Sequence, residues 1–223
     1  CITVPRPVDE ALQRHSLNVA LLNGIMGQWL GLDEKDIRSL ILTGVLHDIG
    51  KTKIPEEILN APRKLTPEEF EVMKRHPLYS FELLGDDISE DVRYAVRWHH
   101  EKLDGKGHPD GLKAESISYF ARITTISDIY DAMLSARSYK KEKIQFDVLQ
   151  WFVTEGSKGI DQNLLNIFIK NMVKVYRQQQ VIMSDGREGC VEYIPLNDMD
   201  HPIVSVGEEV RQVDEDWYCV HMV

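Results

Sequence analysis

The stretch Leu46-His47-Asp48-Ile49-Gly50-Lys51 places an imidazole, a carboxylate and an ammonium group close together along the chain. Residues 37–45 before it carry apolar side chains with helical spacing, so we predict a helix there. His47 and Asp48 then stand in or just past its last turn. Lys51 follows His47 by four residues and shares its face if the helix continues. The stretch therefore predicts polar chemistry at the end of an amphipathic helix.

Histidines are concentrated in the first half of the chain, where six of the eight occur. They stand beside an aspartate, beside another histidine or just before a proline, and packing does not require such positions. Imidazole and carboxylate groups together suit divalent metals, and one carboxylate can bridge two ions. We therefore predict a polynuclear metal site. Its candidate ligands are His15, His47, Asp48, His76, His99, His100 and Asp128.

The spacing of apolar residues predicts a mainly α fold over residues 1–177. Asp33 with Asp36, and Thr66 with Glu69, have the pattern of helix N-terminal caps. Other helices are predicted over 12–30, 89–99, 119–137 and 161–177, and the glycine-rich segment 101–118 is predicted to be a loop. After about residue 178, short apolar runs alternate with turn residues, which predicts a small β subdomain over 178–223 with strands at 181–183, 190–194, 203–206 and 217–220.

The composition, with 43% hydrophobic and 28% charged residues, is typical of a globular protein with a buried core. No stretch approaches the roughly 18 apolar residues of a membrane span. The three cysteines form no CxxC pair, which favours a reducing compartment, and we expect a cytoplasmic location. A net charge of −10 without a long basic run argues against binding to long nucleic acid. A small phosphorylated ligand is still compatible, because bound metal ions reverse the local potential.

Four motifs resemble those of the HD-GYP subgroup of HD-domain phosphohydrolases. They are HDIGK at 47–51, KRHP at 74–77, HHEKLDGKGHPDGL at 99–112 and SDIYDAM at 127–133. The resemblance covers about residues 10–145, and the long loop motif is its most specific part. It implies an HD-domain helical bundle that binds two or three iron or manganese ions. It also implies hydrolysis of the bacterial second messenger cyclic di-GMP to pGpG, and in some members further to GMP.

The resemblance also implies roles for individual residues. The first of two ions would be held by His15, His47, Asp48 and Asp128. The second would share Asp48 and be completed by His76, His99 and His100. Two such ions supply an ionised water as the nucleophile near neutral pH. Asp48 and Lys51 are therefore the predicted catalytic residues, and Lys51 would contact the phosphate together with Arg137, Tyr139 and Lys140.

The sequence departs from the family pattern at two positions. His108 stands where the family has the tyrosine of Gly-Tyr-Pro, in a loop that the family uses near substrate and partner proteins. We predict that His108 lies at the substrate, and an added metal ligand is the weaker interpretation. Ala11 stands where trinuclear members carry a glutamate, and Glu10 points elsewhere on a helix. We therefore predict two metal ions and not three.

Two alternatives to cyclic di-GMP hydrolysis stay open at this point. The chain could bind the dinucleotide without hydrolysing it, or hydrolyse another cyclic dinucleotide such as cyclic GMP-AMP. The partners that the resemblance suggests are a diguanylate cyclase with a GGDEF domain, a second copy in a homodimer, and a sensor domain upstream of Cys1. The role of the β subdomain cannot be predicted from its sequence.

Overall fold

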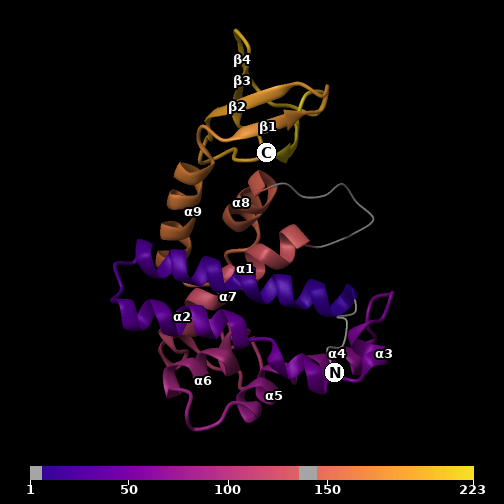
Figure 1. The fold of residues 1–223 in the computed structure, drawn as a ribbon, viewed down its shortest axis with the longest axis vertical. Coiled ribbons are helices and arrows are strands. Elements are labelled where there is room, and N and C mark those ends of the chain that lie inside the picture. The colour runs from indigo at the N-terminus through magenta and orange to yellow at the C-terminus, as the bar shows by residue number, and fades with distance from the viewer. Residues whose placement is uncertain (1–6, 136–144) are drawn as a thin grey trace, which may run out of the picture. The chain divides into compact units, whose positions relative to one another are not determined.

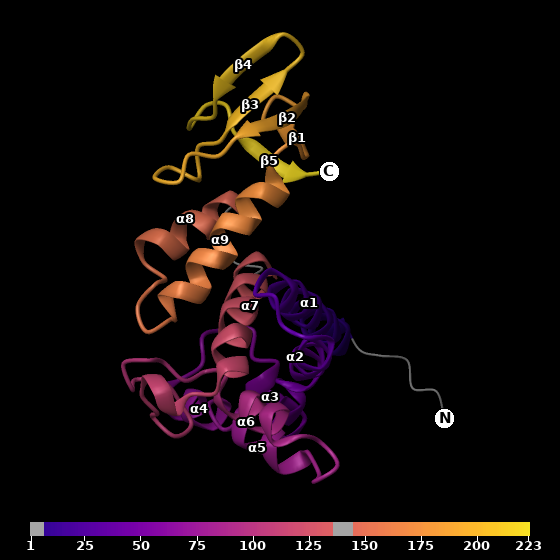
Figure 2. The same cartoon turned by 90° about the vertical axis from the view of Figure 1, so that its left-hand side faces the viewer.

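The computed structural model describes residues 7–135 and 145–223, with side chains from Glu10 onward (Figure 1, Figure 2). The described residues form two compact units. The first contains the residues up to Asp131 together with Gly159–Asp161, and the second contains Ala132 to Lys158 and Gln162 to Val223. The domain boundary between residues 177 and 178, where helix gives way to strand, stays a prediction.

The first unit begins with a helical hairpin of α1 (Pro7–Trp29) and α2 (Glu34–Leu46), which lie side by side in Figure 1. Gly44 has no side chain, which lets the two helices pack so closely that a Cβ atom there would clash with the backbone of Ala20. The fully buried Asn23 donates from Nδ2 to the Leu40 carbonyl at 3.0 Å and to the Thr124 hydroxyl at 2.9 Å. This side chain therefore ties α1 to both α2 and the helix that carries Thr124.

Both predicted helix caps are confirmed. The backbone N–H of Asp36 donates to the Asp33 carboxylate at 2.8 Å. Thr66 and Glu69 form a reciprocal capping box at the start of α4 (Pro67–Met73). In contrast, α2 does not continue to Lys51. His47 is its C-cap, and a 3-10 turn, η1 (Ile49–Lys53), follows.

The helix α7 (Tyr119–Ser135) has ten buried residues, all of which lie in its part that belongs to the first unit, up to Asp131. The remaining elements of this unit are short. They are α3 (Glu56–Leu59), α5 (His76–Leu83), α6 (Glu90–Trp98) and the 3-10 turn η2 (Ala114–Ser116). The predicted loop over 101–118 contains η2 but otherwise has only one isolated β-bridge, between Asp104 and Lys113.

The second unit contains α8 (Gln145–Thr154), α9 (Gln162–Tyr176) and a sheet, and α9 leads directly into the first strand (Figure 2). The rings of Phe152 on α8 and Phe168 on α9 contact each other, with their centroids 6.1 Å apart. The sheet is antiparallel, with the order β4-β3-β2-β1-β5. Its strands are β1 (Gln180–Met183), β2 (Glu188–Tyr193), β3 (Ile203–Val206), β4 (Glu209–Gln212) and β5 (Cys219–Met222).

The predicted mainly α fold with a small C-terminal β unit is confirmed. The sequence did not predict α3, α5, α8 or β4, and β5 begins at Cys219, two residues after the predicted start at Trp217. Within the described ranges, no helix has both the length and the apolar character that crossing a membrane requires.

Candidate metal centre

Three histidines of the candidate site are oriented by the same kind of contact. Each ring Nδ1 lies within hydrogen-bond distance of the backbone carbonyl three residues earlier, in the last turn of a helix. The pairs are His47 with Gly44 (2.8 Å), His76 with Met73 (2.8 Å) and His99 with Val96 (2.7 Å). Carbonyl groups in the last turn of a helix have no partner within the helix, so they are available as acceptors. A carbonyl can only accept, so Nδ1 carries the proton and Nε2 presents its lone pair.

His15 is oriented by a side chain instead. It lies on α1, and its Nδ1 is 2.7 Å from Asp131 Oδ2 on α7. Asn18 donates to the other oxygen of Asp131 at 2.8 Å, which holds the carboxylate in place. A carboxylate behind an imidazole fixes the ring orientation and raises the basicity of the opposite nitrogen. Asp131 therefore serves His15 and is not grouped with the candidate ligands.

The two oxygens of Asp48 face different histidines. Oδ1 is 3.2 Å from His76 Nε2, whereas Oδ2 is 3.3 Å from His47 Nε2 and 3.6 Å from His15 Nε2. Asp128 approaches the same nitrogen of His15, with Oδ1 3.0 Å from Nε2. A carboxylate whose two oxygens face two sets of imidazoles has the arrangement of a bridging ligand.

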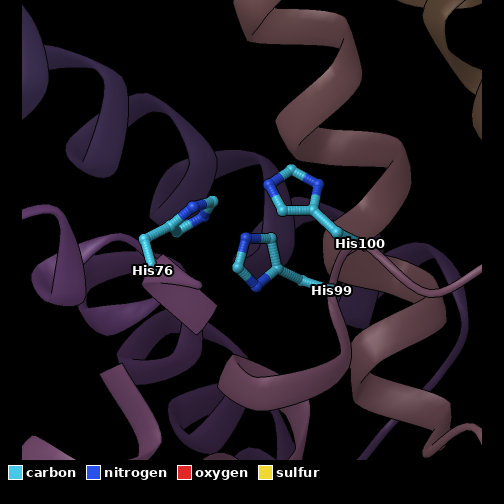
Figure 3. A group of neighbouring side chains, drawn as sticks. All are labelled: His76, His99 and His100. Atoms are coloured by element: carbon cyan, nitrogen blue, oxygen red, sulfur yellow. The ribbon is translucent and has the colours of Figure 1, made fainter. Parts of the chain in front are cut away.

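The candidate ligands therefore fall into two groups that meet at Asp48. His15, His47 and Asp48 form the first, and His76, His99 and His100 form the second, with ligand atoms inside each group within 4.8 Å of one another. Figure 3 shows the rings of the second group converging on a common space. Asp128 lies between the groups, because its Oδ2 is 3.7 Å from His100 Nδ1. All seven predicted ligands are thus brought together from α1, the end of α2, α5, the end of α6 and α7.

The donor set fits divalent cations. Asp48 Oδ1, His76 Nε2 and His99 Nε2 are buried atoms without a hydrogen-bond partner in the described structure. Asp48 Oδ1 and His76 Nε2 face each other at 3.2 Å although each can only accept a hydrogen bond, given the His76 tautomer. Leaving buried acceptors unpaired is costly, and a cation between them removes that cost.

The charge states of His99, His100 and Asp48 also fit metal ligation. Burial, reinforced by neighbouring imidazoles, lowers the pKa of His99 well below its usual value. Burial lowers the pKa of His100 to about 3. Burial would raise the pKa of Asp48, but the imidazoles of His47 and His76 and the Lys51 ammonium hold it well below its usual range. His99 and His100 are therefore neutral and Asp48 is ionised, which are the charge states that metal ligands must have.

His15 differs from these residues in its charge. Burial opposes its protonation, but hydrogen bonds with Asp128 and Asp131 outweigh burial and raise the pKa of His15 to about 9. A ligand nitrogen has to be deprotonated before it binds a cation. His15 therefore gives up a proton when a metal ion binds, and metal uptake at the first group is expected to be weaker at lower pH.

A sequence model of the HD domain matches residues 7–164, which is most of the chain. The chain belongs to the HD domain family. The family predicted from the motifs is thereby confirmed, and the relatives below are consistent with its HD-GYP subgroup.

Similar proteins of this family include named cyclic dinucleotide phosphodiesterases. The chain is 36% identical over 156 residues to the cyclic di-GMP phosphodiesterase response regulator RpfG of Xanthomonas campestris, covering 68% of this chain and 41% of the relative. It is 34% identical over 168 residues to the 3'3'-cGAMP-specific phosphodiesterase 1 of Vibrio cholerae, covering 74% of this chain and 38% of the relative. The chain thus spans less than half the length of these relatives.

The solved structure of Bd1817, described as a HDG"Y"P protein from Bdellovibrio bacteriovorus, superimposes with a TM-score of 0.61 at 19% identity. The match covers 75% of this chain and 54% of that chain. This likeness shows a shared fold.

The predicted substrate residues of this HD domain are placed as follows. Lys51 lies in η1, and its Nζ is 2.6 Å from Asp48 Oδ2, so the 3-10 turn and not a continued helix brings it to the site. His108 lies beside the second group, with its ring 4.8 Å from that of His100. Arg137, Tyr139 and Lys140 fall outside the described residues.

The role of Glu101 in the HD domain was only partly predictable from the sequence. Its buried carboxylate accepts hydrogen bonds from the backbone N–H groups of Asp110 (2.6 Å), Gly111 (3.0 Å) and Leu112 (3.0 Å). It therefore folds the loop after His100 back onto the end of α6. Its place directly after the His99-His100 pair, in a segment rich in glycine, is the signal that points to this role.

Replacing Asp131 with asparagine is expected to weaken metal binding at the first group by about 10- to 100-fold, because His15 loses its orienting carboxylate. Titration of the metal-free protein with Mn²⁺ measures this change. Glu34→Gln, on an exposed side chain of α2, is the matched control and should bind Mn²⁺ as the unchanged protein does. Equal affinities for the two variants would show that Asp131 does not support His15.

Proposed function

We propose that the chain is a metal-dependent phosphodiesterase that hydrolyses cyclic di-GMP to pGpG. The observation that carries this proposal is the placement of Asp48, whose two oxygens face two separate groups of imidazoles. Membership of the HD domain family and similarity to named cyclic di-GMP phosphodiesterases support the same activity. Analysis of the reaction products measures whether pGpG is hydrolysed further to GMP.

The proposed cofactors are two divalent ions, iron or manganese. His15, His47, Asp48 and Asp128 would hold one ion, and His76, His99 and His100 would hold the other, with Asp48 shared. Histidine and carboxylate ligands suit both metals. Two such ions supply an ionised water for attack on phosphorus and neutralise charge on the phosphate. The proposed number is two because Ala11 and Glu10 are both exposed on α1 and Ala11 offers no ligand.

The chain's own residues prepare the site for an anionic substrate. Backbone carbonyls and Asp131 set the orientation of the imidazoles before any ligand binds. Lys51 has 23% of its side chain exposed, so its ammonium can reach a bound phosphate while staying close to Asp48. A cation held at this position lowers the energy of the charged transition state.

Replacing Lys51 with methionine is expected to reduce kcat by roughly 10²- to 10³-fold while leaving the metal content unchanged, because a charge-stabilising donor is lost and no ligand is. Steady-state rates and metal analysis of the same sample test this. Lys53→Met, on an exposed neighbour in η1, should change neither quantity. Loss of metal together with rate in Lys51→Met would contradict the assigned role.

The proposed function is tested by metal analysis of anaerobically prepared protein, followed by turnover in the same sample. Cyclic di-GMP and cyclic GMP-AMP are supplied in competition, and the products are separated by chromatography. Faster formation of pGpG is the expected result. Faster cleavage of cyclic GMP-AMP would assign the specificity named for the Vibrio cholerae relative. Tight binding of cyclic di-GMP by the metal-loaded protein without any product would favour the non-hydrolytic binding module.

The predictions about partners and location stay predictions. They are a homodimer, an upstream sensor domain, a diguanylate cyclase partner with a GGDEF domain, and a cytoplasmic location.

A further inference from the structure

His100 is held differently from the other candidate ligand histidines. His47, His76 and His99 are oriented by backbone carbonyls and His15 by Asp131. Within the described residues, the His100 ring makes no hydrogen bond. Its Nδ1 is 3.7 Å from Asp128 Oδ2, which is beyond hydrogen-bond distance. Another contact must therefore set the orientation of this ring.

That contact is the ring of His108. The two imidazoles are stacked, with centroids 4.8 Å apart and planes inclined by 26°. Two other rings lie near His100: His99 at 4.1 Å with planes inclined by 42°, and His76 edge to face at 5.0 Å, so among these contacts His108 makes the stacked one. The backbone N–H of His108 also donates to the His100 carbonyl at 3.3 Å, which links the two residues a second time. Stacked aromatic rings at this separation attract each other and restrict rotation.

The loop is built to deliver His108 to this position. The buried Glu101 carboxylate holds the backbone N–H groups of three consecutive residues just after Pro109. On the other side of His108, Gly107 approaches the backbone of Glu101 and Lys102 so closely that a Cβ atom there would clash with both. The backbone of His108 is therefore held on both sides by the fold of its loop, next to His100.

We infer that His108 is a positioning residue, which holds the His100 imidazole by stacking in the way that hydrogen bonds hold the other ligand histidines. The inference rests on the proposed function, because His100 is a proposed metal ligand. His108 itself is not grouped with His76, His99 and His100 as a source of ligand atoms. The ring face of His108 that is turned towards His100 holds the His100 imidazole, and the nitrogen atoms of His108 are not needed for this.

The test compares three replacements by titrating metal-free protein with Mn²⁺ and following free Mn²⁺ by electron paramagnetic resonance. His108→Phe keeps an aromatic face and removes both nitrogen atoms, so its Mn²⁺ affinity should stay close to that of the unchanged protein. His108→Leu fills similar space without an aromatic face, and His108→Ala leaves the space empty. Both should bind the ion of the second group about tenfold more weakly, because the loss of an orienting partner reduces metal affinity by at least about this factor. Lys106→Ala, on an exposed side chain of the same loop, is the control.

The outcomes separate this inference from the proposed function. If His108→Phe binds as weakly as His108→Leu, the nitrogen atoms act as ligands or donors and the inference is overturned. If His108→Leu binds as tightly as the unchanged protein, stacking has no role and the inference is again overturned. In both cases the metal site itself stands. If the unchanged protein binds no Mn²⁺, the proposed metal site fails and the inference fails with it.

Discussion

Asp48→Asn protein is expected to lose bound metal and cyclic di-GMP turnover together. One oxygen of Asp48 faces His76 and the other faces His15 and His47, so removing the charge weakens both groups at once. Turnover should fall by roughly 10³-fold or more, which is a larger reduction than the removal of one charge-stabilising group causes. Asparagine keeps the shape of the side chain, which is only 2% exposed, so the fold should be retained. Metal content per chain and the rate of pGpG formation are measured on one sample.

Asp86→Asn is the matched control for this prediction. Asp86 is an aspartate of the same unit, but its side chain is 99% exposed and its Oδ1 lies 2.9 Å from Arg93 Nη1. Metal content and turnover should be unchanged in this variant. Turnover that persists in metal-free Asp48→Asn protein would show that the proposed mechanism is wrong. Unchanged metal content in Asp48→Asn would show that Asp48 is not the shared ligand.

Gly50→Ala is expected to have the largest effect on stability. Gly50 is buried, and a Cβ atom there would clash with the His76 carbonyl and the Ser80 backbone nitrogen. The same approach lets the Gly50 N–H donate to the Ser80 hydroxyl at 2.7 Å, while that hydroxyl donates to the His47 carbonyl at 2.9 Å. Overpacking against backbone atoms should reduce the free energy of unfolding by about 3 kcal/mol or more. Urea denaturation followed by circular dichroism measures this loss.

Gly31→Ala controls for the intrinsic cost of replacing glycine. Gly31 has a positive φ of 68°, and nothing lies within 4 Å of the added Cβ atom. Only backbone strain of about 1–2 kcal/mol should result. Gly50→Ala should also shift His76 away from Asp48 and reduce metal content, whereas Gly31→Ala should not. A Gly50→Ala protein as stable as Gly31→Ala would contradict the close approach of η1 and α5.

Helix starts could be predicted from the sequence because their partners lie three residues apart. Asp33 with Asp36 and Thr66 with Glu69 show this. The helix α8 was missed because its buried residues Phe146, Val148, Leu149 and Phe152 do not separate helical from strand spacing. The strand β4 was missed because all four of its residues are exposed, so it has no alternation of buried and exposed side chains.

The residues of the candidate site were predictable, but their arrangement was not. Residue types and motif spacing pointed to seven side chains that the structure brings together. The division of the two Asp48 oxygens between His76 and His47 depends on the packing of η1 against α5, which no local pattern specifies. The stacking of His108 on His100 depends in the same way on how Glu101 folds the loop.

The carbonyl acceptors behind His47, His76 and His99 have a consequence for how the site tolerates mutation. Every amino acid has a backbone carbonyl, so no substitution at Gly44, Met73 or Val96 deletes the acceptor. These acceptors depend on where the helices end and not on the side chains at Met73 and Val96, whereas Gly44 is restricted by its close packing on the Ala20 backbone. His15, in contrast, relies on one carboxyl group that a single codon change can remove. Mutations should therefore be tolerated unevenly across the metal centre, and the orientation of His15 on α1 should be the first to be lost.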